Sequence, residues 1–144
     1  NKSPEYVRTY SNKIATKNEK FNFSDFTQSN FFFENGAIGK ITSNFACMHK
    51  HQHVLKVYGT KKTFIYDDRG ARIFSKRDPF ESKGYKVRKL YNGKDCLLPG
   101  FFKNLNNKKN HKKDIMREIN LMSAAISSDI SLKKNKKIKI KKFI

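Results

Sequence analysis

The apolar residues of this chain change their spacing once, and that change limits the folds it can adopt. Up to Tyr91 they recur at every second position in short runs, as in half-buried β-strands. From Asp114 onward, four of them recur at helical spacing: Ile115, Ile119, Met122 and Ile126. Lys136–Ile144 then alternates isoleucine with lysine. Strands, a helix and a last strand predict an α+β fold, a predominantly antiparallel open sheet with helices packed on one face.

Turn signals divide the strand region. Asn35-Gly36 predicts a two-residue type I′ hairpin, because both residues tolerate positive φ. A strand is expected over Ala37–His49, and its alternation places Cys47 on the same side as Ile41 and Phe45, as a buried and unreactive thiol. Further strands are predicted at His53–Tyr58, Thr63–Asp67, Ala71–Lys76 and Tyr85–Tyr91.

The helical region and the start of the chain are less regular. Asp114 is placed to cap the main helix or to oppose its dipole. The apolar stripe that follows it is expected to be the helix face that covers the sheet. A shorter helical piece is indicated by Phe101, Phe102 and Leu105. Residues 1–20 are polar and fit either a short helix or the close of an earlier element.

Size and charge set further limits. With 144 residues the chain is long enough for one domain, and 13% aromatic residues argue against disorder. No apolar run could span a membrane, and the separated Cys47 and Cys96 favour reduced thiols in the cytoplasm. The net charge of +20 fits a nucleic-acid partner. The abundance of Asn, Phe, Ile and Lys equally fits an AT-rich coding bias with no selected partner.

Three patterns, taken in order, resemble the C-terminal domain of the Gfo/Idh/MocA oxidoreductases. Phe33–Gly39 looks like the family's F-x-N-G-x-x-G hairpin. Val54–Lys61 is similar to its strand that ends in Gly-Thr-Lys. The helix Asp114–Ser128 and the basic strand after it parallel the family's ending. Lys62 departs from this pattern, because the family commonly has glycine there.

The resemblance implies that residues 1–144 are the substrate-binding and oligomerisation domain of an NAD(P)-dependent sugar or sugar-nucleotide oxidoreductase. It implies a homo-oligomer formed through a sheet face, and either NAD or NADP as the cofactor. The family's Gly-rich dinucleotide loop, its Glu-Lys-Pro segment and its Gly-Gly…Asp…His segment do not occur in this sequence. We therefore expect the domain to be incomplete at its N-terminus, with the nucleotide-binding domain before Asn1. No catalytic or cofactor-binding residue is assigned to this chain, and the chain alone should not turn over.

The segment His49-Lys50-His51-Gln52-His53 is the sharpest local feature. If it is extended, alternation points all three imidazoles to one face. By the resemblance, this stretch supplies a polar residue to the sugar pocket, and we assign substrate binding to His51 first and His49 second. Solvated loop histidines are the alternative. No metal site is assigned, because no carboxylate or thiolate lies at matching spacing.

Two features could instead favour nucleic acid. Lys103–Lys142 carries thirteen basic residues against three acidic ones, which would attract phosphate, although lysines on an edge strand also prevent sheet aggregation. Phe31-Phe32-Phe33 could stack bases, although core or subunit interface fits better beside Glu34 and a tight turn. A small basic nucleic-acid-binding domain is therefore the alternative function. The sequence does not identify the substrate, the choice of NAD or NADP, or the oligomeric state.

Overall fold

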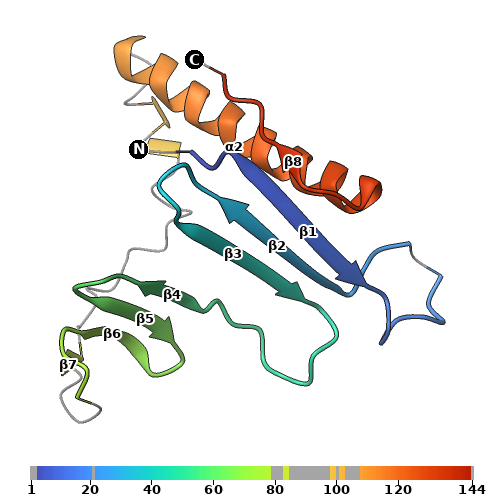
Figure 1. Ribbon diagram of the computed structural model, residues 1–144, viewed down its shortest axis with the longest axis horizontal. Helices are drawn as coiled ribbons and strands as arrows, with labels where there is room; N and C mark the ends of the chain where they lie inside the picture. Colours follow the sequence, from blue (N-terminus) through green and yellow to red (C-terminus); the bar gives the residue numbers. More distant parts are fainter. Residues whose placement is uncertain are drawn as a thin grey trace. The chain divides into compact units, whose positions relative to one another are not determined.

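The computed structural model describes residues 3–20, 22–78, 83–84, 98–99, 101–102 and 108–143 (Figure 1). The chain forms two compact units: one comprises Asn1–Met48 and Lys103–Ile144, the other His49–Phe102. Each unit contains a four-stranded sheet in which every pairing is antiparallel. The predicted α+β class is confirmed, and the strands divide between two sheets.

The first sheet has the order β3-β2-β1-β8. Its strands are β1 (Tyr6–Asn12), β2 (Phe26–Phe32), β3 (Ile38–Asn44) and β8 (Ile138–Lys139). Strand β1 is an inner strand, although the sequence left this region open between a short helix and the close of an earlier element. Its Tyr-Val-Arg-Thr-Tyr run is rich in β-branched and aromatic residues, which favour a pleated surface. Strand β8 is much shorter than the predicted Lys136–Ile144.

The β2–β3 hairpin is confirmed, but its turn differs from the predicted type I′. Gly36 has a φ of +80°, whereas Asn35 does not have positive φ. The Gly36 N–H donates to the Phe33 carbonyl at 3.0 Å, and the Phe33 N–H donates to the Ala37 carbonyl at 3.0 Å. These bonds describe a type I turn followed by a left-handed glycine, the common three-residue hairpin loop. Only the glycine needs positive φ in this loop.

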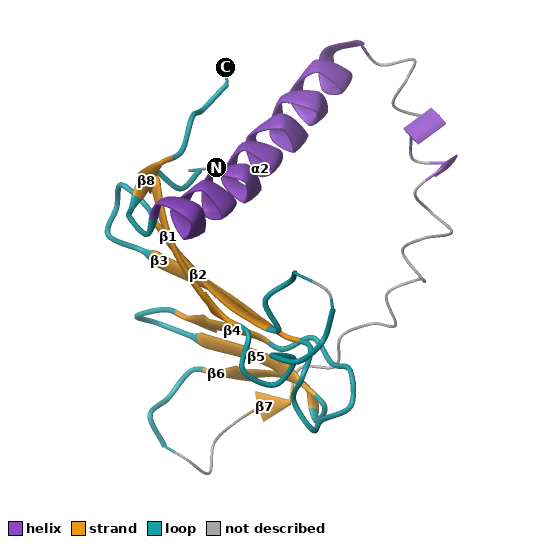
Figure 2. Ribbon diagram, turned by 90° about the vertical axis from the view of Figure 1, so that its right-hand side faces the viewer, coloured by secondary structure: helices purple, strands orange, loops and turns teal. Residues whose placement is uncertain are grey.

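Helix α2 (Lys108–Lys134) lies along one face of the first sheet (Figure 2). It begins six residues before Asp114, so the predicted capping role of Asp114 is wrong. That carboxylate instead lies 3.9 Å from Arg117, one turn further on. The helix has no acidic residue in its first turn, and Lys133 and Lys134 in its last turn oppose the dipole.

The prediction that the apolar stripe of α2 faces the sheet is also wrong. Its four residues are 38–59% exposed: Ile115, Ile119, Met122 and Ile126. The buried residues of α2 are small instead, namely Ala124, Ser127 and Ser131. Small side chains let the helix approach the sheet closely, and serine hydroxyls can pair with polar groups of the strands. The apolar stripe therefore lies on the outer side of the helix.

Hydroxyl groups join α2 to the sheet. Oγ1 of Thr9 lies 3.0 Å from Oγ of Ser29 and 2.7 Å from Oγ of Ser128, and those two serine oxygens are 2.6 Å apart. Ser131 accepts a hydrogen bond from the Thr9 backbone N–H at 3.0 Å and donates to the Lys136 carbonyl at 2.6 Å. Beside this network, a small apolar core unites Val7, Ala124 and Ile140, with Phe31 and Ile138 packed against them. Because buried polar groups need partners, this network fixes the position of the helix closely.

The second sheet has the order β4-β5-β6-β7, with β4 (Leu55–Tyr58), β5 (Thr63–Asp67), β6 (Gly70–Phe74) and β7 (Lys83–Gly84). Strand β5 matches its predicted bounds. In the β5–β6 turn Gly70 has a φ of +85°, and Arg72 pairs with Asp67 at 2.6 Å. Phe101 and Phe102 are helical as predicted. The predicted strand Tyr85–Tyr91, Leu105 and Cys96 lie outside the described residues.

Cys47 is exposed, so the prediction of a buried thiol is wrong. Strand β3 ends at Asn44, three residues earlier, and the inward and outward alternation ends with it. The Cys47 sulfur lies 3.7 Å from the Asn44 carbonyl oxygen in the bend that follows.

Candidate functional site

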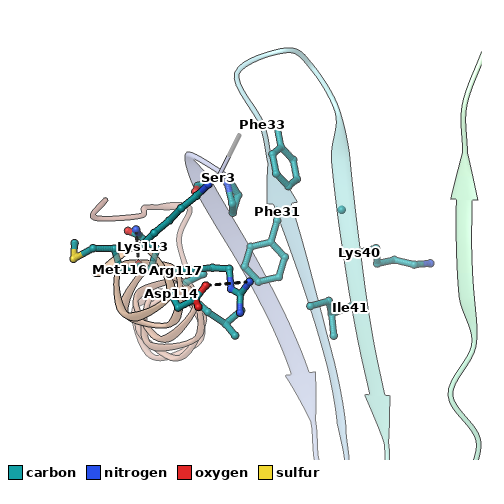
Figure 3. Close-up of a pocket in the computed structure, with 14 residues that line it drawn as sticks. Ser3, Phe31, Phe33, Lys40, Ile41, Lys113, Asp114, Met116 and Arg117 are labelled. Atoms are coloured by element: carbon teal, nitrogen blue, oxygen red, sulfur yellow. Dashed lines mark hydrogen bonds and ion pairs between the residues drawn. The ribbon is translucent and has the colours of Figure 1, made fainter. Parts of the chain in front are cut away.

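A groove of about 930 Å³ opens between α2 and strands β2 and β3 of the first sheet (Figure 3). It arises because the small residues that draw α2 onto the sheet lie in its C-terminal half, whereas its N-terminal half stands away from the strands (Figure 2). Apolar side chains form much of its lining: Phe31, Phe33, Ile41, Met116, Leu121 and Ala124.

Three polar side chains of the groove have partners within the chain. Arg117 lies 3.9 Å from Asp114 and 3.2 Å from Glu118. The Asn120 side chain donates to the Phe143 carbonyl at 2.9 Å and accepts from the Phe143 N–H at 2.8 Å. Lys40 contributes to the rim, but its side chain points away from α2 (Figure 3). The described lining residues include no histidine or cysteine. The groove is therefore suited to receive apolar groups.

The histidine segment lies in the other unit, between β3 and β4, where the chain is not in a strand. All three histidines are exposed. The rings of His51 and His53 meet edge to face, with centroids 4.8 Å apart. The Lys50 ammonium lies 3.1 Å from the Asp68 carboxylate, which ties the segment to the β5–β6 turn. Among the described residues, no group of three or more His, Cys, Asp or Glu side chains could hold a metal ion.

His49 is oriented by its own neighbour. Its Nδ1 lies 2.9 Å from the Lys50 carbonyl oxygen, which can only accept, so Nδ1 carries a proton. In the neutral ring this leaves Nε2 as an acceptor. An exposed imidazole with one nitrogen committed in this way can accept a hydrogen bond from a hydroxyl group.

The second sheet exposes an apolar face. The strand register places Leu55 opposite Tyr66 and Val57 opposite Phe64. Leu55, Val57 and Tyr66 are 54%, 52% and 45% exposed. The opposite face carries the Arg72–Asp67 pair, whose hydrogen bond holds the pKa of Asp67 below its ordinary value. The apolar face is therefore the more suitable of the two for contact with another protein surface.

The sequence reasoning missed a second surface, the face of the first sheet that points away from α2. Val7 and Thr9 face the helix, so alternation turns Tyr6, Arg8 and Tyr10 to the opposite side. In the sequence this face is indicated by Tyr6–Tyr10, where aromatic or basic residues alternate with Val and Thr. This alternation becomes informative only once residues 6–12 are known to form a strand.

Comparison with known proteins identifies the fold. No protein-family model matches the sequence, and no curated protein matches it significantly. Among solved structures, levoglucosan dehydrogenase in complex with NADH and levoglucosan aligns over 98% of this chain and 46% of its own, with a TM-score of 0.70 and 10% identity. A protein of Thermotoga maritima described as an oxidoreductase aligns over 96% of this chain and 41% of its own, with a TM-score of 0.67 and 11% identity.

These structures are Gfo/Idh/MocA-type oxidoreductases, so the resemblance inferred from the sequence is confirmed at the level of the fold. The chain spans less than half the length of these structures. No helix among the described residues is long and apolar enough to cross a membrane.

Proposed function

We propose that this chain is the C-terminal substrate-binding and oligomerisation part of a cytoplasmic, NAD(P)-dependent sugar or sugar-nucleotide oxidoreductase, inactive alone. The observation that carries the proposal is the fold match, which covers almost all of this chain and under half of the dehydrogenase chain. The levoglucosan dehydrogenase structure holds NADH and a sugar derivative. A chain with the fold of one part of such an enzyme fits the same role.

The surface of α2 supports the same proposal. The apolar stripe Ile115–Ile126 and the groove beside it leave large apolar side chains open on two sides of one helix. Isolated domains rarely expose contiguous apolar surface of this kind, because its burial is the main source of stability. We propose that the nucleotide-binding domain packs against the side of α2 that carries the apolar stripe.

The described residues do not fit a dinucleotide. A nucleotide-binding turn places a Gly-rich loop between a strand and the start of a helix. Here Gly36 and Gly70, the two glycines with positive φ in the described part of the chain, lie in β-hairpin turns that lead into strands. The sequence also has no G-x-G-x-x-G run. We therefore assign the cofactor to the nucleotide-binding domain.

For substrate binding we retain His51 first and His49 second. Both are exposed, and the ring of His49 has Nε2 available to accept a hydrogen bond from a sugar hydroxyl. In the intact enzyme, His51→Ala should raise KM about tenfold, the value of one polar contact of about 1.4 kcal/mol, with little change in kcat. Gln52→Ala is the matched control, because it removes a neighbouring exposed polar side chain that the proposal does not use, whereas the His53 ring contacts His51. An equal rise in KM for both variants would reject the assignment.

For the homo-oligomer we propose the apolar face of the second sheet. In a twofold contact the same patch meets itself, which suits the uncharged side chains of Leu55, Val57 and Tyr66. The outer face of the first sheet is less suitable, since Arg8 and Lys139 would meet their own copies. Val57→Lys should shift the molar mass measured by light scattering toward the monomer, whereas Lys56→Ala on the opposite face should not. An unchanged mass for Val57→Lys would exclude this surface.

The proposal is tested by expressing the full open reading frame that contains this chain. Purified protein is assayed for NADH or NADPH formation with a panel of sugars, anhydrosugars and nucleotide sugars, and this chain alone is assayed in parallel. Turnover by the intact protein, with none from the chain, supports the proposal. An open reading frame with no nucleotide-binding domain, or an intact protein that neither binds NAD(P) nor oxidises any of these compounds, rejects it.

A further inference from the structure

We propose that the outer face of the first sheet, the side opposite α2, binds single-stranded nucleic acid. The proposal does not depend on the oxidoreductase role. We call this surface the basic face, and it comprises these residues: Tyr6, Arg8, Tyr10, Gln28, Asn30, Phe32, Ile38, Lys40, Lys137 and Lys139.

The register of the strands builds the basic face row by row. Tyr6 lies opposite Phe32 on one side and Lys139 on the other. In the next row Arg8 lies opposite Asn30, which lies opposite Lys40. Hydrogen bonds between Ser128 and the hydroxyls of Thr9 and Ser29 fix the other face against α2, so the residues of the basic face must point away from the helix. Figure 3 shows the Lys40 side chain pointing in that direction.

Cations and aromatic rings interleave on this face. The Lys137 ammonium lies 4.5 Å from the ring centroid of Tyr6 and 4.6 Å from that of Phe32. The Arg8 guanidinium carbon lies 4.7 Å from the ring centroid of Tyr10. These contacts hold the cations at defined positions over the sheet instead of leaving them free in solvent. Proteins that bind single strands combine basic side chains for the backbone with aromatic side chains for the bases.

The charge of the face is of one sign. Strands β1, β2, β3 and β8 contain no aspartate or glutamate. Nη2 of Arg8 donates to Oδ1 of Asn135 at 2.5 Å, while its buried Nη1 has no hydrogen-bond partner among the described residues. A phosphate backbone complements such a surface, and a second copy of the same face would repel it.

One exposed ring and one exposed aliphatic side chain favour a single strand over a duplex. Tyr10 is 50% exposed and Ile38 is 67% exposed, so an unstacked base could contact either side chain. The bases of a duplex are stacked on one another and leave only phosphates and groove edges to a flat sheet. The amides of Gln28 and Asn30 are half-buried and contact each other at 3.5 Å, and their remaining donors and acceptors can pair with base edges.

The test measures fluorescence anisotropy of a labelled oligonucleotide of about 12 nucleotides, within the range that one small domain covers. It is run with the single strand and with the matched duplex over a series of salt concentrations. Four phosphate contacts, from Arg8, Lys40, Lys137 and Lys139, predict a slope of log K against log salt of about −3 for the single strand. The double variant Lys137→Ala/Lys139→Ala should halve this slope.

Two matched variants separate the face from net charge and from the fold. Lys112→Ala/Lys113→Ala removes the same charge from α2, on the other side of the sheet, and should leave most of the affinity. Tyr10→Ala should weaken single-strand binding about tenfold, whereas Tyr10→Phe, which keeps the ring, should restore it. Circular dichroism confirms that each variant is folded.

Three outcomes would overturn the proposal. One is the absence of single-strand binding at low salt. Another is equal affinity for the duplex and the single strand, together with no effect of Tyr10→Ala, which would indicate attraction between polyelectrolytes only. The third is an equal loss in the α2 control and in the Lys137/Lys139 variant, which would assign the affinity to the net charge of the whole chain.

Discussion

Replacing Ser131 with alanine removes a single oxygen atom at the point where α2, β1 and the turn before β8 meet. Ser131 is fully buried. Its hydroxyl accepts from the Thr9 N–H at 3.0 Å and donates to the Lys136 carbonyl at 2.6 Å. The β1–β8 pairing ends at Val7, so the Thr9 N–H has this hydroxyl as its partner in place of a further residue of β8.

The size of the effect follows from those two bonds. Leaving a buried N–H without a partner costs about 1–3 kcal/mol, and a lost bond to the carbonyl adds about 1 kcal/mol. Alanine forms helix more readily than serine, which returns about 0.5 kcal/mol. We expect Ser131→Ala to lower the free energy of unfolding by about 2 kcal/mol.

Urea denaturation followed by circular dichroism measures this change. The midpoint should fall while the slope of the transition stays constant. Ala125→Ser is the control, because it makes the reverse exchange at an exposed position of the same helix and should change stability by about 0.5 kcal/mol or less. One hydrogen bond contributes about 0.5–1.5 kcal/mol. If the free energy of unfolding of Ser131→Ala lies within about 0.5 kcal/mol of the parent value, the hydroxyl contacts do not fix the position of the helix.

Three further predictions follow from burial and charge. Met122→Lys/Ile126→Lys should leave the free energy of unfolding of this chain in urea nearly unchanged, since both side chains are exposed. The same double variant should weaken packing of the nucleotide-binding domain on α2. A large loss of stability would instead place the stripe in the core. Hydrogen bonds from Thr16 hold the pKa of Asp25 below its ordinary value of 3.8. The ionised carboxylate of Asp25 therefore stabilises the fold above that pH, and this stabilisation is lost as the pH falls through the lowered pKa. Asp25→Asn should therefore flatten the decline in melting temperature on acidification, and an unchanged profile would count against this role. Cys47 should react with a thiol reagent in the native chain as fast as it does in urea, and strong native protection would show that it is buried.

The hairpins were predictable because their signals are local. Asn35-Gly36 and Asp67–Gly70 mark turns whichever sheet their strands join, and the bounds of β5 follow from the alternation between two such turns. The type of the first turn was not predictable from Asn-Gly alone. The same dipeptide fits a type I′ turn and a type I turn with a following glycine, and the pairing of Phe33 with Ala37 selects the second.

The orientation of α2 could not be read from its apolar stripe. Periodicity identifies the apolar side of a helix but not what that side packs against. In this chain the sheet offers hydroxyls, from Thr9 and Ser29, and it is met by the serine side of the helix. The apolar stripe is left for another surface. A helix can pack on its sheet through its polar side where its apolar side contacts a second domain, as we propose for α2.

The two candidate surfaces differ in how far the sequence indicates them, and the roles of His49 and His51 stay predictions. The segment that contains His49 and His51 was found from the sequence, since imidazoles at every second position are conspicuous. The basic face was not found, because it joins Arg8, Lys40 and Lys137 from three distant parts of the chain. Only the strand register places those residues side by side.

The most direct test of the central claim is whether the intact protein that contains this chain oxidises a sugar with NAD or NADP. Turnover that requires the nucleotide-binding domain, and that is lost when Met122→Lys/Ile126→Lys prevents its packing on α2, is the predicted result. If the intact protein binds neither dinucleotide nor sugar, the fold would be retained without the oxidoreductase function, and the proposed function would be contradicted.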